Sequence, residues 1–168
     1  GTHVAGTAAA KNNGIGVVGV SAGASVVPVR VFGCSGGSST STILAGINHV
    51  GRYDIPGDVV NLSLGGYYGS GCTSNSSYRS ALVSLSNAGT FVAIAAGNSS
   101  GNSSLYNPAC VNGSRIYTVA SMTCSRGFSS FSNYNMNPVD VIATGSSVRS
   151  TYLNGGYATL SGTSMASP

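Results

Sequence analysis

Residues 76–96 read SSYRSALVSLSNAGTFVAIAA. Within this stretch, Ser76–Asn87 suits a helix, and Ala88-Gly89 is a typical helix end because glycine readily adopts the left-handed conformation found there. Thr90–Ala96 follows as an almost unbroken apolar run. An unbroken run, unlike an alternating one, indicates a strand buried on both faces, as in a parallel sheet. The stretch therefore predicts an α/β fold.

The same alternation of strand and helix extends toward the N-terminus. Ser25–Phe32 and Asp58–Leu64 are apolar, β-branched runs that we interpret as strands. Between them, Thr40–Val50 carries apolar residues at helical spacing, and Thr2–Lys11 is rich in alanine and compatible with a helix. We predict a doubly wound, mostly parallel sheet that is flanked by helices and joined by right-handed crossovers.

Beyond residue 100 the pattern predicts two further strands, a hairpin and the start of a helix. The hairpin is indicated by the turn sequence Asn154-Gly155-Gly156. These elements are, in order, Ile116–Ser121, Val139–Ala143, the hairpin arms Arg149–Tyr152 and Tyr157–Ser161, and the helix from Thr163.

The composition narrows the class of protein. The chain has 168 residues, enough for one domain, and only 6% of them are charged, against about 25% in a typical soluble domain. This excludes a coiled coil or a charged helical bundle. The net charge is +4, but the basic residues are scattered, so we expect no nucleic-acid partner. The apolar runs are too short for a membrane span, which needs about 20 residues.

Glycine-containing loops follow three of the predicted strands. They are Gly33–Ser39, Leu64–Gly66 and Ala96–Ser100. In open α/β sheets, ligands bind beyond the carboxyl ends of the strands, so these loops predict the site. Asn98 adds an amide donor that could stabilise an oxyanion. Ser164 opens the last predicted helix, where it is either a nucleophile or an ordinary N-cap.

Five short motifs occur along the chain in a fixed order. They are GTHVAGT at 1–7, SLGG at 63–66, AAGN at 95–98, SSFSNY at 129–134 and SGTSMASP at 161–168. In this order and at this spacing, the chain resembles the subtilisin-like serine proteases, and in particular their proteinase K and aqualysin branch. The resemblance covers essentially the whole chain.

The resemblance implies a serine endopeptidase that works through an acyl-enzyme. Ser164 matches the family nucleophile, and Asn98 matches the oxyanion donor, joined by the backbone N–H of Ser164. Thr163 resembles the family threonine beside the oxyanion. No cofactor for catalysis is implied.

The general base is expected outside these residues. The family motif is His-Gly-Thr-His, and its first histidine is catalytic; His3 matches the second, which is structural. The resemblance then places the catalytic histidine immediately before Gly1 and the catalytic aspartate further upstream. We expect residues 1–168 to be a partial peptidase domain, truncated at both ends and inactive alone, with His49 a surface or packing residue.

The resemblance also implies a peptide-binding cleft. Two segments would pair with the substrate backbone as an added strand, and the S1 pocket would have small walls without a carboxylate, which favours an apolar P1 residue. The substrate-binding residues are Ser35, Gly36, Gly37, Ser63, Leu64, Gly65, Ala95, Ala96, Gly97, Tyr106 and Asn107.

The four cysteines are Cys34, Cys72, Cys110 and Cys124. Without a Cys-x-x-Cys pair a zinc site is not expected, and the wide spacing favours disulfides, with four buried free thiols as the alternative. The resemblance implies an upstream partner for Cys34. We expect a Cys110–Cys124 bridge, with a bridge from Cys72 to either as the alternative.

Asp140 resembles a family aspartate that binds calcium together with backbone carbonyls near Ser114 and Ile116. A carboxylate with carbonyl oxygens is a plausible structural calcium site; the alternative is a solvated loop aspartate.

The resemblance implies protein or peptide substrates, no nucleic-acid or membrane partner, a monomer and secretion from the cell. Two other hypotheses stay open. One is a pseudoprotease that binds peptides on the same fold, and the other is a structural Ser/Gly-rich protein whose motif matches are accidental.

Overall fold

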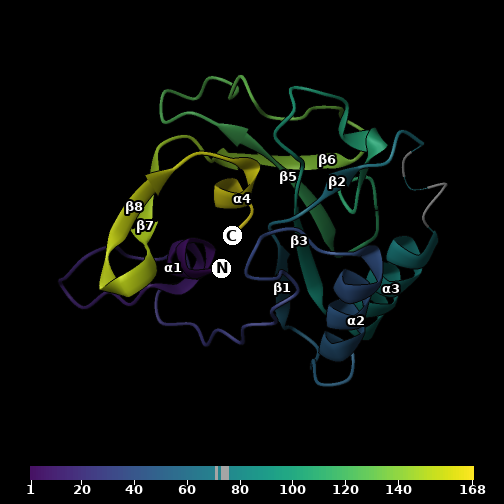
Figure 1. Cartoon of the computed structure of the whole chain (residues 1–168), viewed down its shortest axis with the longest axis horizontal. Helices are drawn as coiled ribbons and strands as arrows, with labels where there is room; N and C mark the ends of the chain where they lie inside the picture. Colours follow the sequence, from purple (N-terminus) through teal and green to yellow (C-terminus); the bar gives the residue numbers. More distant parts are fainter. Residues whose placement is uncertain (71, 73–75) are drawn as a thin grey trace.

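The computed structural model describes residues 1–70, 72 and 76–168. At its centre is a parallel sheet of four strands in the order β1 (Val59–Leu62), β3 (Phe91–Ala95), β5 (Ile116–Met122) and β6 (Val139–Thr144). Figure 1 shows these strands running through the middle of the molecule. The predicted α/β class is confirmed.

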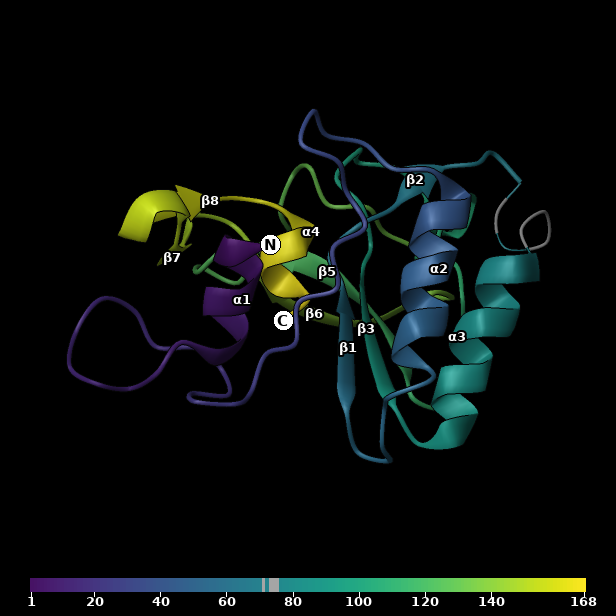
Figure 2. The same ribbon diagram turned by 60° about the horizontal axis from the view of Figure 1, so that its bottom comes forward.

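Helices cover both faces of the sheet. Helices α2 (Thr40–Val50) and α3 (Ser76–Ala88) lie side by side on one face, whereas α1 (Thr2–Ala9) and α4 (Thr163–Ala166) lie on the other (Figure 2). The N-terminus of α2 is capped by Ser39, whose Oγ accepts a hydrogen bond of 3.1 Å from the backbone N–H of Thr42. The doubly wound arrangement predicted from the sequence is therefore present.

The main core lies between β3 and the pair α2–α3. Val92 and Ile94 of β3 and Leu82 of α3 are fully buried. Because α4 contacts β3 from the opposite side of the sheet, both faces of this strand are covered, which explains why its side chains do not alternate with polar ones. The core cluster consists of Ile43, Ile47, Leu62, Tyr78, Leu82, Leu85, Val92, Ile94, Ala109, Val111 and Ile116.

The predicted hairpin is also present, with the arms β7 (Val148–Thr151) and β8 (Tyr157–Leu160). It lies against α1, where the buried ring of His3 donates from Nε2 to the carbonyl oxygens of Val148 and Ala158, each at 3.1 Å. His3 therefore joins the N-terminal helix to the hairpin, consistent with a structural role.

Four short elements were not predicted. β2 (Gly66–Tyr67) and β4 (Tyr106–Asn107) form an antiparallel pair of two residues each, and short 3-10 turns occupy Ser103–Leu105 and Leu153–Gly155. Strands this short have no readable periodicity, since a period needs several residues.

The prediction of a strand at Ser25–Phe32 is wrong. The segment runs without a ladder partner among the described residues, and Val27 is 82% exposed. β-branched composition favours extended backbone, but a strand also needs a neighbour to accept its hydrogen bonds, and Pro28 removes one donor.

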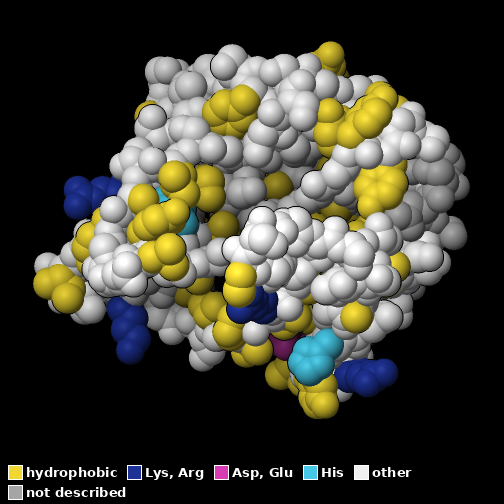
Figure 3. Space-filling view, in the orientation of Figure 1, with side chains coloured by type: hydrophobic (Ala, Val, Ile, Leu, Met, Phe, Trp, Pro, Cys, Tyr) yellow, Lys and Arg dark blue, Asp and Glu magenta, His cyan; other side chains and the backbone are white. Residues whose placement is uncertain are grey.

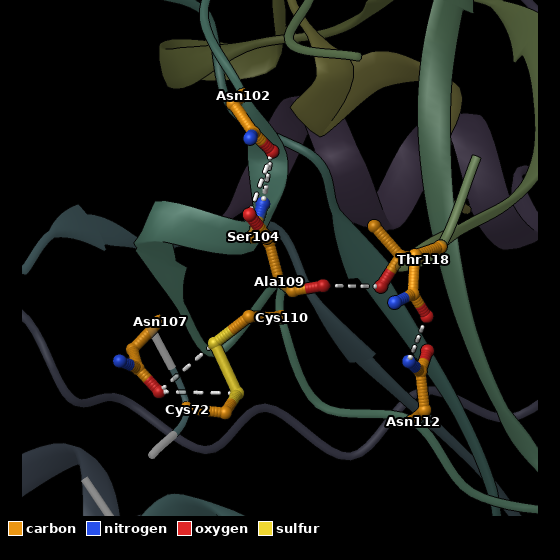
Figure 4. Close-up of a disulfide and its surroundings, with 9 residues drawn as sticks. Cys72, Asn102, Ser104, Asn107, Ala109, Cys110, Asn112 and Thr118 are labelled. Atoms are coloured by element: carbon orange, nitrogen blue, oxygen red, sulfur yellow. Dashed lines mark hydrogen bonds between the residues drawn. A yellow bond between two sulfur atoms is a disulfide. The ribbon is translucent and has the colours of Figure 1, made fainter. Parts of the chain in front are cut away.

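The expected Cys110–Cys124 bridge is also wrong. Cys72 and Cys110 form a disulfide with their Cα atoms 5.5 Å apart (Figure 4), and Cys34 and Cys124 are exposed free thiols. The Thr118 hydroxyl donates to the Ala109 carbonyl oxygen at 2.8 Å, which fixes residue 110 beside the middle of β5. Cys124 follows the end of that strand, and at about 3.3 Å per residue it lies too far along the chain to bridge.

Charged side chains are few on the face of the molecule shown in Figure 3. Neutral polar side chains and backbone predominate there. None of the helices in the described part of the chain has the length and apolar character that crossing a membrane requires.

Candidate active site

A cavity of about 450 Å³ opens where the sheet strands β1 and β3 end and α4 begins. It brings together residues that are far apart in the sequence, including Leu64, Asn98 and Ser164. This agrees with the rule that ligands bind beyond the carboxyl ends of parallel strands. The lining residues are Phe32, Leu64, Gly65, Gly66, Tyr67, Ala95, Ala96, Gly97, Asn98, Ser99, Tyr106, Ala109, Thr163 and Ser164.

The amide of Asn98 is oriented by Thr163. Its Oδ1 accepts hydrogen bonds from the backbone N–H of Thr163 at 2.7 Å and from the Thr163 hydroxyl at 2.9 Å. The Thr163 Oγ1 in turn accepts from the backbone N–H of Gly97 at 3.1 Å. Because Oδ1 holds both donors of Thr163, the Nδ2 group is left as the donor that Asn98 offers to a ligand.

Ser164 is the second residue of α4. The N-cap of this helix is Gly162, so the interpretation of Ser164 as an ordinary N-cap is wrong. Its hydroxyl donates to the Ser63 carbonyl oxygen at 3.3 Å, and the Ser63 hydroxyl donates to the Ser164 carbonyl oxygen at 2.9 Å. This reciprocal pair fixes the start of α4 against the end of β1.

Neither histidine of the chain is hydrogen-bonded to Ser164. His3 is occupied by the hairpin, and His49 lies exposed on α2 with its ring 4.9 Å from that of Tyr53. The surface role expected of His49 is therefore confirmed. Within the described residues, the site holds a hydroxyl and a side-chain amide donor but no imidazole.

The three acidic residues also have roles elsewhere. Asp54 accepts from the Thr90 hydroxyl, and Asp58 accepts from the backbone N–H of Ile55 at 3.1 Å. None of these contacts involves the cavity.

Asp140 lies on strand β6, so its interpretation as a loop aspartate is wrong. Its Oδ2 accepts from the backbone N–H of Thr118 at 2.8 Å. One oxygen of the carboxylate is therefore used to join β6 to β5. The described residues contain no cluster of three or more His, Cys, Asp or Glu side chains.

Some predicted cleft residues lie outside the cavity lining. Ser35–Gly37 form a turn closed by hydrogen bonds between Gly33 and residues 36 and 37, whereas Phe32, just before this turn, lines the cavity. Asn107 is only 1% exposed and does not line the cavity. Its Oδ1 lies 3.6 Å from the sulfur of Cys72 and 3.5 Å from that of Cys110 (Figure 4).

Phe32, Tyr67 and Ala109 line the cavity but were not predicted. The ring of Tyr67 packs edge to face on that of Tyr106, with centroids 5.3 Å apart. The sequence signalled these residues only in that they lie next to residues predicted for the cleft. The β2–β4 pair, which brings the rings of Tyr67 and Tyr106 together, is too short to predict.

Comparison with known proteins agrees with this geometry. The model of the subtilase family matches residues 1–168. The chain is 42% identical to alkaline serine exoprotease A of Vibrio alginolyticus and 39% identical to subtilisin Savinase of Lederbergia lenta, in each case over all 168 residues. It covers 29% and 58% of these proteins, respectively.

Solved structures give the same result. The crystal structure of a cold-adapted subtilisin-like serine proteinase matches with a TM-score of 0.84 at 38% identity. A protease from Pseudoalteromonas arctica PAMC 21717 matches with a TM-score of 0.86 at 42% identity. Each match covers 99% of this chain and 56% or 54%, respectively, of the other chain. The chain spans between 29% and 58% of the length of these four proteins. Over all of its 168 residues it belongs to the subtilase family of serine proteases.

Proposed function

We propose that the protein carrying this chain is a serine endopeptidase that cleaves peptide bonds through an acyl-enzyme on Ser164. The observation that carries the proposal is the arrangement of Asn98, Thr163 and Ser164 at one cavity. It offers a hydroxyl next to an amide donor whose orientation is fixed, which is the pairing that acyl transfer needs.

In this mechanism, Ser164 Oγ forms a bond to the substrate carbonyl carbon as its proton passes to a general base. The negative charge that develops on the carbonyl oxygen is stabilised by Asn98 Nδ2 and the backbone N–H of Ser164. Cleavage of the C–N bond then releases the amine, which takes up the proton from the base. Water attacks the resulting ester in a second step of the same kind and restores the hydroxyl.

The base in this proposal is a histidine immediately before Gly1, with an aspartate further upstream. Two observations support it: the motif at residues 1–3 contains only the second histidine of the family pattern, His3, and that histidine is held by the hairpin. Without the base, the Ser164 hydroxyl is a poor nucleophile, so we expect residues 1–168 alone to be inactive.

We further propose a preference for apolar P1 residues. The cavity is lined by small residues such as Ala95 and Gly97 and by the ring of Tyr106, and none of its lining side chains is charged. The substrate backbone would add as a strand between the segments 35–37 and 63–65. Chromogenic peptides that differ only at P1 test this: Leu or Phe should give a higher kcat/KM than Lys, Arg or Glu.

Labelling of the full-length protein with a fluorophosphonate tests the nucleophile. The reagent should modify Ser164, and Ser164→Ala should abolish both the label and casein hydrolysis. Ser161→Ala is the matched control, since Ser161 is exposed and lies outside the cavity lining. A label on any other residue would contradict the proposal.

A second candidate is a pseudoprotease that binds peptides without cleaving them. It is favoured by one observation, the lack of an imidazole bonded to Ser164 within the described residues. The residue encoded immediately before Gly1 separates the two: histidine supports the protease, and any other residue supports the binding module.

The proposal includes secretion, a monomer and a structural calcium ion. Secretion is supported by the Cys72–Cys110 disulfide, because such bonds persist in oxidising compartments.

For the calcium site, Asp140 supplies an exposed carboxylate, of which one oxygen is already bonded to Thr118. Backbone carbonyls near Ser114 and Ile116 would complete the oxygen ligands. A rise in Tm with calcium that Asp140→Asn removes would support this; an unchanged Tm would contradict it.

A further inference from the structure

Asn133, in the motif SSFSNY, is completely buried. Its side chain forms three hydrogen bonds with the backbone of the loop that carries Asn98. Nδ2 donates to the Ala96 carbonyl oxygen at 3.0 Å, and Oδ1 accepts from the N–H groups of Ser99 at 2.9 Å and Gly101 at 3.0 Å. One amide therefore holds the loop on both sides of Asn98.

The backbone of the same segment adds to this attachment. The N–H of Asn133 donates to the Gly97 carbonyl oxygen, the N–H of Tyr134 to that of Gly101, and the N–H of Ser100 to that of Phe131, each at 2.9 Å. The motif therefore runs along the loop 97–101 and is bonded to it at several points.

The loop leaves space for this amide at Gly97. A Cβ atom built there would lie 2.2 Å from Asn133 Nδ2, and the backbone φ of Gly97 is +106°, a conformation that other residues rarely adopt. The side chain of Asn133 thus packs directly against the peptide that precedes Asn98.

We propose that Asn133 is a positioning residue for the oxyanion donor. Asn98 is held by side chains from two directions: Thr163 fixes its amide, and Asn133 fixes the backbone from which that amide extends. Stabilisation of an oxyanion depends on donor positions within a few tenths of an ångström, so loss of the second support should displace Nδ2 and slow the chemical step. Asn133 acts through Asn98 and does not touch the substrate.

The inference rests on the proposed function. The first step is therefore to show that the full-length wild-type protein hydrolyses peptides and is labelled at Ser164. Asn133→Asp keeps the shape and both acceptor contacts but loses the donor to Ala96, and Asn133→Ala removes all three bonds. We expect kcat for a chromogenic peptide to fall by about 10- to 100-fold, the range for small misplacements of a catalytic group, with KM changed much less.

The decisive comparison is a double-mutant cycle with Asn98→Ala. If Asn133 acts through Asn98, the Asn133 substitutions should cost almost nothing further in kcat once Asn98 is alanine. Asn102→Ala is the matched control, because Asn102 bonds to Ser104 and Asn135 instead of to the loop 96–101; its kcat should stay close to wild type.

Folding is checked by circular dichroism and by the fraction of enzyme that the fluorophosphonate titrates, so that kcat refers to folded protein. Should Asn133→Ala fail to fold, the Asp variant carries the cycle. Equal losses with and without Asn98, or a change confined to KM, would overturn the inference while leaving the proposed protease intact. A wild-type protein without labelling would instead refute the proposed function.

Discussion

Removal of the Cys72–Cys110 disulfide should destabilise the protein strongly. The bridge joins residues separated by 38 positions. In the chain-entropy description, cross-linking a loop of this length lowers the entropy of the unfolded chain enough to contribute about 4 kcal/mol at 25 °C. The variant Cys72→Ala/Cys110→Ala should therefore lose about that much free energy of unfolding.

Urea denaturation of the full-length protein measures this loss. Ser164→Ala serves as the background, so that self-digestion does not distort the transition. Cys124→Ala is the matched control: its thiol is free and exposed, and its free energy of unfolding should stay within about 0.5 kcal/mol of the parent.

A peptide map gives an independent result. Trypsin cleaves after arginine, so Cys72 lies in the peptide 53–79, Cys110 in 80–115 and Cys124 in 116–126. Without reduction, the first two peptides should be joined. Joining of 80–115 to 116–126, together with a large destabilisation by Cys124→Ala, would refute the pairing found in the structure.

Two further predictions concern pH and catalysis. Burial, with a smaller contribution from Tyr68, raises the pKa of Tyr78 from 10.0 to about 12, so the unfolded chain ionises first. The free energy of unfolding should therefore be unaffected by Tyr78 below about pH 10 and should fall by about 2–3 kcal/mol as the pH rises to 12. In urea denaturation at several pH values, Tyr78→Phe should lose less free energy of unfolding over this range. An equal loss in the variant would disprove the assignment to Tyr78. Asn98→Ala should lower kcat by about 100- to 1,000-fold, the range known from loss of an oxyanion donor in a subtilisin, a member of the same family. Steady-state kinetics that show a change in KM alone would contradict that role.

Periodicity predicted the regular elements well. The α2 helix was predicted with its observed bounds, Thr40–Val50, because its apolar spacing is a local signal. The same reasoning placed β3 and α3 to within a residue or two. It failed at 25–32, where the composition favours a strand but pairing depends on a neighbour elsewhere in the chain.

The site was predicted where local motifs coincide with strand ends. Asn98 was predicted from a strand end and Ser164 from the start of a helix, and the structure brings both to one cavity. For the disulfide, the preferred Cys110–Cys124 pairing was wrong and the alternative from Cys72 to Cys110 was correct. The lining residue Tyr67 was missed. Both features depend on which loops meet in space. The role of Asn133 could not be predicted either. Its side chain bonds to backbone groups, which every residue has, so these contacts leave no pattern of residue types in the sequence.

The bond between His3 and the hairpin has a consequence for the order of folding. Its partners lie 145 and 155 residues further along the chain. A ribosome adds about 5–20 residues per second, so α1 is made roughly 10–30 seconds before the strand that holds it. During this time the helix has no docking site on β7, and His3 has no partner on β8. Contacts of such sequence separation also slow folding in general, because a long loop must close before they form. The N-terminal helix should therefore be among the last elements to become protected against hydrogen exchange during biosynthesis.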